Sequence, residues 1–290
     1  MNWQVFKTRA LTALVFVAAM LAGLLWNQWS FFILFSVIHW GCWIEYQKLV
    51  KRIDPSYASI SSFHEYGVIL AGWALMLYFA GDDYRIGTIS LHAIGLFTGL
   101  IFAFALPIIE ILFSKQFNLK HISYSAMGLL YISLSWALMI GIRSMDGIWI
   151  SGKGSHFEMG RTVPLVIIFS IWINDTMAYI TGSLIGRTPF SKVSPKKTIE
   201  GTIGGAVLCV AAMGALAYYM QLPVMHVCNI AAIAAIVGTA GDLLESKLKR
   251  MANVKDSGRI MPGHGGFLDR FDSLLLATPV VWLYVMVAVK

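Results

Sequence analysis

Charged side chains are scarce in this sequence. Asp, Glu, Lys and Arg make up only 13% of its 290 residues, whereas 58% of the residues are hydrophobic and the mean hydropathy is +0.70. A water-soluble domain needs far more polar surface than this composition supplies, so a soluble globular protein is excluded. Long apolar runs are abundant instead, and the lipid bilayer is the environment that solvates them.

Cysteine is scarce as well, and it gives no sign of a metal site. Cys42, Cys209 and Cys228 fall in or beside apolar runs, and their spacing matches no metal-binding motif. We interpret them as packing residues.

The first apolar run is not followed by a cleavage site and a soluble mature domain, so we interpret it as a retained span.

Apolar runs of about 20 residues, the length of a transmembrane helix, recur along the chain. They lack the strict alternation of barrel strands, and backbone groups in lipid are satisfied within a helix. The sequence therefore predicts an all-α, polytopic transmembrane helical bundle of about nine spans. The expected spans cover residues 9–26, 29–45, 66–80, 87–113, 124–143, 162–186, 201–220, 227–246 and 271–289.

The loops between these spans predict the orientation of the chain. Lys and Arg gather in alternate loops, which favours a cytoplasmic N-terminus in a bacterial inner (plasma) membrane. Residues 1–145 hold about five spans, and residues 146–290 hold the remaining spans with cytoplasmic loops at 187–200 and 247–270. The net charge of +7 follows from this topology, so no nucleic-acid partner is expected.

An acid interrupts one apolar run at Asp175. A carboxylate inside a membrane span costs about 2.5–3.5 kcal/mol on insertion scales, so something must compensate for it. Its helix face also carries polar and small residues, namely Tyr179, Gly182 and Ser183. The stripe either lines a functional site or forms interhelical hydrogen bonds, for which Asn174 and Thr176 are also suited.

A second polar stripe repeats at helical spacing and consists of Gly238, Gly241, Asp242, Glu245, Ser246 and Lys249. Asp242 and Glu245 lie one turn apart, where two carboxylates repel each other unless a cation joins them. Oxygen ligands without cysteine or clustered histidine favour a hard ion such as Mg²⁺ over zinc. The alternative is a helix end at the membrane interface, where Glu245 pairs with Lys249.

The segment 255–273, KDSGRIMPGHGGFLDRFDS, combines cations, glycines and acids. Its glycines let backbone amides approach a ligand. Three cations in it suit phosphate oxygens: Lys255, Arg259 and Arg270. His264 is a proton carrier, a donor to phosphate or a structural residue. Asp269 and Asp272 are acidic candidates for the site, or they cap the last span.

A basic motif precedes another span at residues 194–201, SPKKTIEG. Lys196 and Lys197 each follow the general bias of cytoplasmic loops toward positive charge. As a cluster, however, two cations, a hydroxyl and an acid meet at the membrane face that also carries the other charged segments. The motif is therefore a candidate part of the same site.

Together these segments resemble the phosphatidate cytidylyltransferase family. The motifs that carry the resemblance are Asn-Asp-Thr at 174–176, Ser-Pro-Lys-Lys-Thr-x-Glu-Gly at 194–201, Gly-Asp-Leu-x-Glu-Ser at 241–246 and Lys-Asp-Ser-Gly-Arg-x-x-Pro-Gly-His-Gly-Gly-x-x-Asp-Arg-x-Asp at 255–272. The last motif is long and highly specific. The resemblance covers residues 165–290 motif by motif, whereas the first five spans match only in being hydrophobic.

The resemblance implies a nucleotidyltransferase of phospholipid biosynthesis. Such an enzyme transfers CMP from CTP to phosphatidic acid, giving CDP-diacylglycerol and pyrophosphate, and residues 146–290 would be its catalytic region. It further implies Mg²⁺ as the cofactor, K⁺ as an optional second ion, and a homodimer. Membrane lipid as the surroundings follows from the composition, and an active site facing the cytoplasm follows from the basic loops. The attacking phosphate is already ionised at neutral pH, since its second pKa is about 6, so no strong general base is required.

The patterns and the resemblance together assign roles to individual residues. The expected catalytic residues are Asp242, Asp269, Lys249 and Ser246. The expected metal ligands are Asp242, Asp269, Asp175 and Glu245. The expected substrate-binding residues are Lys196, Lys197, Thr198, Lys255, Arg259, His264, Arg270 and Asn174.

Two other functions stay open at this point. A CTP-dependent polyprenol or dolichol kinase would use the same nucleotide and metal, but its alcohol substrate would attack the γ-phosphorus and release CDP. A secondary transporter of an anion would also place acids and basic loops in a helical bundle. It would have sites at the midplane and paired broken helices, whereas here the charges gather at one face.

Overall fold

The computed structural model describes residues 3–113, 118–150, 156–191, 193–258 and 265–289. The chain forms two compact units. Unit 1 consists of Met1–Ser144 and Met251–Arg270, and unit 2 consists of Met145–Arg250 and Phe271–Lys290. The segment that follows the second polar stripe therefore belongs with the N-terminal helices rather than with the stripe itself.

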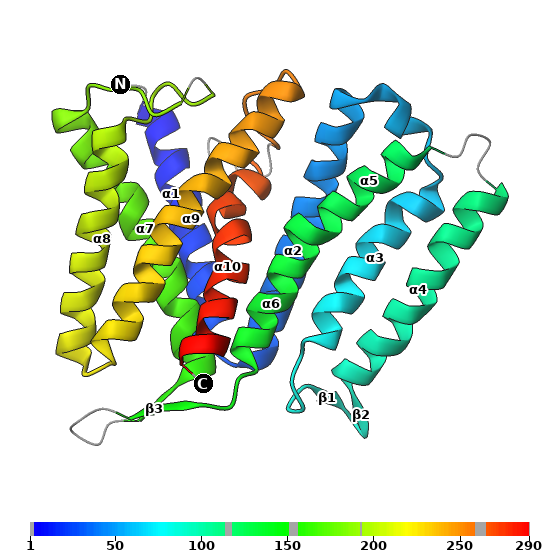
Figure 1. The fold of residues 1–290 in the computed structure, drawn as a ribbon, viewed down its shortest axis with the longest axis horizontal. Coiled ribbons are helices and arrows are strands. Elements are labelled where there is room, and N and C mark those ends of the chain that lie inside the picture. Colours follow the sequence, from blue (N-terminus) through cyan, green and yellow to red (C-terminus); the bar gives the residue numbers. More distant parts are fainter. Residues whose placement is uncertain (1–2, 114–117, 151–155, 192, 259–264, 290) are drawn as a thin grey trace. The chain divides into compact units, whose positions relative to one another are not determined.

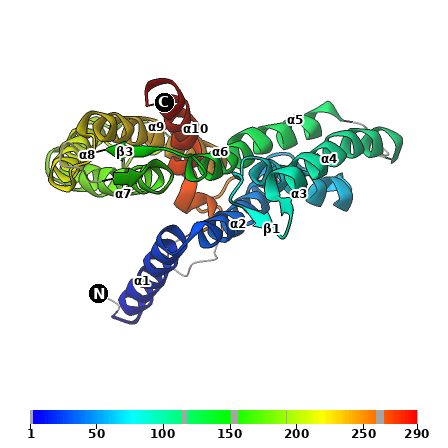
Figure 2. The same cartoon turned by 90° about the horizontal axis from the view of Figure 1, so that it is seen from below.

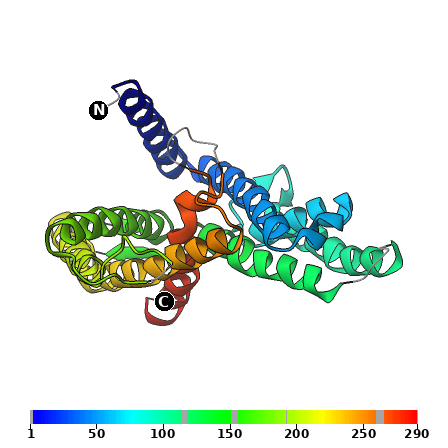
Figure 3. The same cartoon turned by 90° about the horizontal axis from the view of Figure 1, so that it is seen from above.

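Unit 1 is built from antiparallel helices (Figure 1). They are α1 (Trp3–Leu25), α2 (Gln28–Ile53), α3 (Ser62–Tyr78), α4 (Leu91–Phe113), α5 (Leu119–Gly128) and α6 (Leu134–Arg143), with a 3-10 turn at Pro55–Ser59. A two-residue hairpin, β1 (Arg85–Ile86) and β2 (Ile89–Ser90), precedes α4 and turns at Gly87, whose φ is +64°. Figures 2 and 3 show α1 extending away from the remaining helices of this unit.

Polar side chains mark where the helices of unit 1 begin. The Asn27 side chain accepts from the Ser30 backbone N–H at 2.8 Å, and the Ser30 hydroxyl oxygen accepts from the Asn27 backbone N–H at 3.1 Å, which completes a capping box. Ser61 accepts from the His64 N–H at 3.0 Å, and Asn118 accepts from the Lys120 N–H at 3.0 Å. Each cap satisfies a backbone donor that has no partner within its own helix.

A short π-helical segment, Leu129–Ser133, joins α5 to α6 in one continuous rod. It directs the buried hydroxyl of Ser133 toward α2. There the Trp43 Nε1–H donates to the Ser133 Oγ at 2.8 Å, and the His39 Nε2 lies 3.0 Å from the same oxygen. Segments of this kind are rare, and Ser133 of this one contacts two residues of α2.

Unit 2 contains a hairpin and four long helices. The hairpin pairs β3 (Ile148–Ile150) with β4 (His156–Glu158), and α7 (Met159–Ile185), α8 (Ile199–Met220), α9 (Val224–Met251) and α10 (Leu268–Ala288) follow. Figures 2 and 3 show α7, α8 and α9 side by side. Small residues let α7 and α8 pack closely, because a Cβ on Gly205 would lie 2.7 Å from the Ala178 Cβ.

The helical membrane architecture predicted from the sequence is confirmed. Six helical segments of the described residues are long and apolar enough to cross a bilayer: Leu91–Leu112, Leu119–Arg143, Met159–Ile185, Ile199–Met220, Val224–Met251 and Leu268–Ala288. In α1, Leu11–Leu25 is apolar but shorter. Helices α2 and α3 overlap the expected spans 29–45 and 66–80, so the count of nine stays a prediction.

The buried hydroxyl of Ser133 gives a first test of the fold. Ser133→Ala leaves the Trp43 donor unpaired in the core, which costs about 1–3 kcal/mol. We expect a lower melting temperature in detergent. Ser123→Ala is the matched control, because within the described ranges this exposed serine donates only to the Lys120 carbonyl of its own helix. Equal melting temperatures for the two variants would contradict the assigned role of Ser133.

Candidate active site

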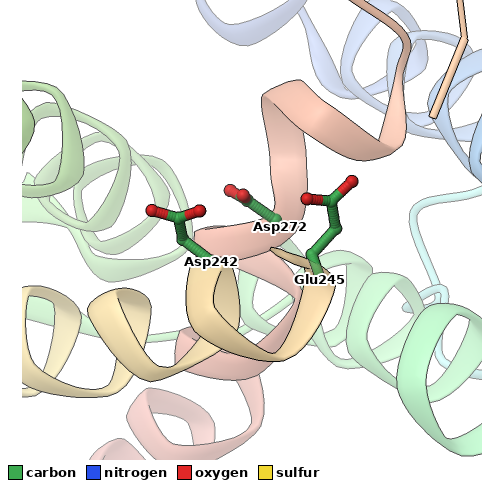
Figure 4. Close-up of side chains that lie close together, drawn as sticks. All are labelled: Asp242, Glu245 and Asp272. Atoms are coloured by element: carbon green, nitrogen blue, oxygen red, sulfur yellow. The ribbon is translucent and has the colours of Figure 1, made fainter. Parts of the chain in front are cut away.

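Three carboxylates gather in unit 2, where α9 packs against α10. Asp242 and Glu245 lie one turn apart on α9, Asp272 comes from the first turns of α10, and one oxygen of each lies within 4.8 Å of the others. Figure 4 shows Asp272 between the two α9 side chains. Oxygen donors at this spacing fit a hard cation such as Mg²⁺. We refer to these residues as the carboxylate group.

A close helix contact brings the carboxylate group together. A Cβ on Gly241 would lie 2.5 Å from the Asp272 carbonyl oxygen, and one on Gly238 would lie 3.3 Å from the Ser273 Cβ. Glycine at these positions therefore lets α9 and α10 approach where the acids lie. At the opposite end of the contact between α9 and α10, the His226 Nδ1 lies 2.9 Å from the Tyr284 hydroxyl. The same hydroxyl accepts from the Asn229 side chain at 2.9 Å.

Two lysines offset the charge of the carboxylate group. The Lys197 Nζ forms an ion pair with Asp242, and the Lys249 Nζ forms one with Glu245, whose side chain is fully buried. Burial lowers the pKa of Lys197 below its ordinary value, while the negative charges of Asp175 and Asp272 oppose that shift. The site therefore balances acids and cations in a partly dehydrated environment.

A structured loop presents Lys197. The Glu200 carboxylate accepts from the backbone N–H groups of Arg187 and Thr188, both at 3.1 Å, and from the Thr188 hydroxyl at 2.8 Å. Thr198 caps α8 by accepting from the Gly201 N–H at 3.1 Å. These bonds fix the residues on both sides of Lys197. The predicted substrate-binding residue Thr198 thus has a structural role as a cap, and Lys196 beside it is exposed.

Several other predicted residues also lie in unit 2. The Ser246 hydroxyl donates to Asp242 at 3.3 Å, consistent with its expected place beside the acids. Asp175 lies on α7 and acts electrostatically on Lys197. Asn174 is buried, and its Oδ1 has no hydrogen-bond partner within the described part of the chain.

Asp269 lies in unit 1, on the first turn of α10. Its Oδ2 accepts from the Ser257 N–H at 2.9 Å, the Ser257 hydroxyl at 2.9 Å and the Gly266 N–H at 2.8 Å. Asp269 thus joins Ser257 and Gly266 to the start of α10. The predicted pairing of Asp269 with Asp242 at a metal is not tested by these contacts. Asp272 joins Asp242 and Glu245 in unit 2, a position at which the sequence suggested a helix cap.

Glu45 of α2 was missed by the sequence analysis. Its Oε1 accepts from the Phe267 N–H at 3.0 Å, and its Oε2 accepts from the Leu268 N–H at 2.9 Å and the Ser257 hydroxyl at 2.7 Å. These contacts cap α10 and lie within unit 1. A Cβ on Gly258 or Gly266 would collide with the Glu45 carboxylate, which explains the glycines there. The available signal was a lone acid at the end of an apolar run.

The remaining predicted residues divide into two sets. Lys255 and Arg270 are exposed residues of unit 1. Arg259 and His264 lie outside the described residues. Their predicted contacts with substrate stay predictions.

Comparison with known proteins shows which family this sequence resembles. The sequence profile described as the cytidylyltransferase family matches residues 7–288. A Bacillus subtilis phosphatidate cytidylyltransferase is 33% identical over 76% of this chain and 77% of its own length. The Synechocystis protein of that name is 36% identical over 59% of this chain and 64% of its length. The Aquifex aeolicus protein of that name is 40% identical over 43% of this chain and 48% of its length.

The Glu45 contacts predict a measurable effect on backbone protection. Glu45→Ala removes three hydrogen bonds to a carboxylate, each worth about 1.5–3 kcal/mol. We expect amide hydrogen exchange at Phe267 and Leu268 to accelerate by at least about tenfold, the equivalent of 1.4 kcal/mol. Mass spectrometry of peptides that cover Phe267 and Leu268 measures this exchange.

The matched control for this experiment is Glu65→Ala. Glu65 also pairs with a residue of α2, accepting from the Lys51 Nζ at 2.5 Å, and among the described residues no hydrogen bond or ion pair joins it to the start of α10. Its substitution should leave exchange at Phe267 and Leu268 unchanged. If Glu45→Ala and Glu65→Ala gave the same protection there, Glu45 would not hold the start of α10.

Proposed function

Because this chain belongs to the cytidylyltransferase family, we propose that it transfers the cytidylyl group of CTP to phosphatidate, giving CDP-diacylglycerol and pyrophosphate. The observation that carries the proposal is the carboxylate group with its two lysines, set in the motifs that match the family. The relatives named phosphatidate cytidylyltransferase support the choice of phosphatidate as the lipid acceptor.

The proposed reaction is a displacement at the α-phosphorus of CTP. A phosphate oxygen of phosphatidate forms a bond to that phosphorus. The bond between the α-phosphorus and the oxygen that bridges the α and β phosphates of CTP breaks, and this oxygen leaves as a terminal oxygen of pyrophosphate. The attacking monoester has a second pKa of about 6 and is ionised at neutral pH. Catalysis then requires positioning of the reactants and compensation of phosphate charge, and none of the proposed roles is that of a general base.

The residues of unit 2 fit these requirements. Lys197 and Lys249 are placed to meet triphosphate or lipid phosphate once their carboxylate partners engage a cation. When held by Asp242, Glu245 and Asp272, Mg²⁺ would offset negative charge on the phosphates. Asp175 and Asp269 stay in the proposed ligand set on the basis of the motifs, and K⁺ stays an optional second ion.

The location of the protein suits a reaction between a soluble nucleotide and a lipid. Its apolar helices make it an integral membrane protein. We place the site at the cytoplasmic face of a bacterial inner membrane, because the basic loops carry the motifs. A homodimer is part of the proposal on the strength of the resemblance alone.

Substitution of Asp242 tests the function and its metal site together. Asp242→Asn keeps the shape of the side chain but removes a charged ligand. We expect cytidylyl transfer to fall by on the order of 100-fold or more, without recovery at high Mg²⁺, because one preorganised electrostatic contact is typically worth that much. Asp146→Asn is the matched control, since Asp146 is an exposed acid of the same unit.

The assay uses detergent-purified protein, Mg²⁺, phosphatidate and CTP labelled at either the α or the γ phosphate. Transfer of the α label into lipid, with the γ label leaving as pyrophosphate, is the expected result. Transfer of γ label to a polyprenol would identify a kinase instead. Wild-type activity in Asp242→Asn would remove this residue from the metal site.

A further inference from the structure

Unit 1 contains a large cavity that has no part in the proposed reaction. Its volume is about 590 Å³, and it lies between α3, α4 and α5. Its walls are mainly aliphatic and aromatic, with Val68, Leu75, Leu96, Leu100, Phe102 and Leu106 among them. This volume lies within the range of about 300–1,000 Å³ that is typical of small-molecule sites.

The cavity extends along the helices that line it. On α3 its lining runs from His64 to Tyr78, about 21 Å at 1.5 Å per residue. This length is enough to cross one leaflet of hydrocarbon, which is about 15 Å deep, half of about 30 Å. The lining residues Leu96 and Leu100 are 40% and 47% exposed, so the cavity opens at the helix surface. A single extended acyl chain matches this shape and polarity.

Small residues on α4 create the space. A Cβ on Gly95 would lie 2.7 Å from the Ala74 carbonyl oxygen, so α3 and α4 touch there. One turn on, a Cβ on Gly99 would meet only the Ala74 Cβ, at 3.8 Å. Ala103 follows on the same face and also lines the cavity. The two helices therefore make close contact at one level and leave a channel at the next.

One end of the cavity carries a chain of hydrogen-bonded polar groups. The His64 Nδ1 lies 3.0 Å from the Glu110 Oε2, the His64 Nε2 lies 2.8 Å from the Ser125 Oγ, and that hydroxyl lies 3.0 Å from the Tyr57 hydroxyl. His64, Glu110 and Ser125 are buried and line the cavity. Burying such groups among membrane helices is costly even when they bond one another, and ionisable residues retained at such places usually mark a functional site.

Glu110 gives this end its specificity. One carboxylate oxygen is engaged by His64, and the other has no hydrogen-bond partner within the described part of the chain. A carboxylate repels a phosphate monoester but forms short, charge-assisted bonds with an N–H donor that carries positive charge. The polar end thus favours an ammonium head group over phosphatidate.

We propose that this cavity binds one acyl chain of a membrane phospholipid whose head group places a primary ammonium on Glu110. The lipid is a bound component of unit 1, separate from the substrate of the proposed reaction. Lipid binding in unit 1 can therefore be tested separately from the function proposed for unit 2.

Native mass spectrometry of the purified full chain tests the proposal. Protein stripped of lipid is mixed with phosphatidylethanolamine, phosphatidylglycerol or phosphatidic acid of identical acyl chains, and the bound fraction is measured. We expect phosphatidylethanolamine to bind at least about tenfold more tightly than the other two. Equal binding of phosphatidylglycerol or phosphatidic acid would overturn the assignment of the head group.

Two variants locate the bound lipid. Ala103→Phe should fill the cavity and reduce phosphatidylethanolamine binding at least about tenfold, whereas Ala105→Phe, the same change on α4 outside the cavity lining, should not. Glu110→Gln keeps the side-chain shape and should abolish the preference for the ammonium head group. Binding by Ala103→Phe at the wild-type level, or an unchanged preference in a folded Glu110→Gln, would overturn the proposal.

Discussion

The close contact between α9 and α10 at Gly241 is the constraint on which the candidate site depends. Without a side chain at that position, the carbonyl of Asp272 approaches α9, and three carboxylates come within reach of one cation. Acids this close repel one another strongly where water is scarce. The arrangement is compatible with a folded bundle because Lys197 and Lys249 supply opposite charge and because its oxygens suit a divalent ion.

The N-terminal helices have a role beyond filling the bilayer. Through Glu45, α2 holds the first turn of α10, and Asp269 binds the backbone of the segment that precedes it. Asp272 lies one turn further along the same helix. A carboxylate of unit 1 thus caps the start of α10. The cavity beside α4 is the lipid site that we propose for the same unit.

The sequence predicted the helical membrane class because its composition excludes a soluble domain and its long apolar runs lack the alternation of barrel strands. It placed Asp242 with Glu245 because both belong to one helix. Residues that depend on contacts between distant segments were harder to find. Asp272 joins the acids only through the packing of α9 on α10. Glu45 lies 223 residues from Leu268, whose amide it binds, so no local pattern could reveal their contact. The number of membrane spans stays a prediction, because α2 carries more polar residues than a typical span and α3 is only 17 residues long.

Binding of Mn²⁺, a spectroscopic substitute for Mg²⁺, tests the central claim most directly. The free ion can be followed by electron paramagnetic resonance while the purified protein is titrated, without any substrate. If Asp242, Glu245 and Asp272 form the metal site, Asp272→Asn should weaken Mn²⁺ binding at least about tenfold, equivalent to 1.4 kcal/mol, while Asp146→Asn leaves it unchanged. Equal affinity in wild type and Asp272→Asn would contradict the account.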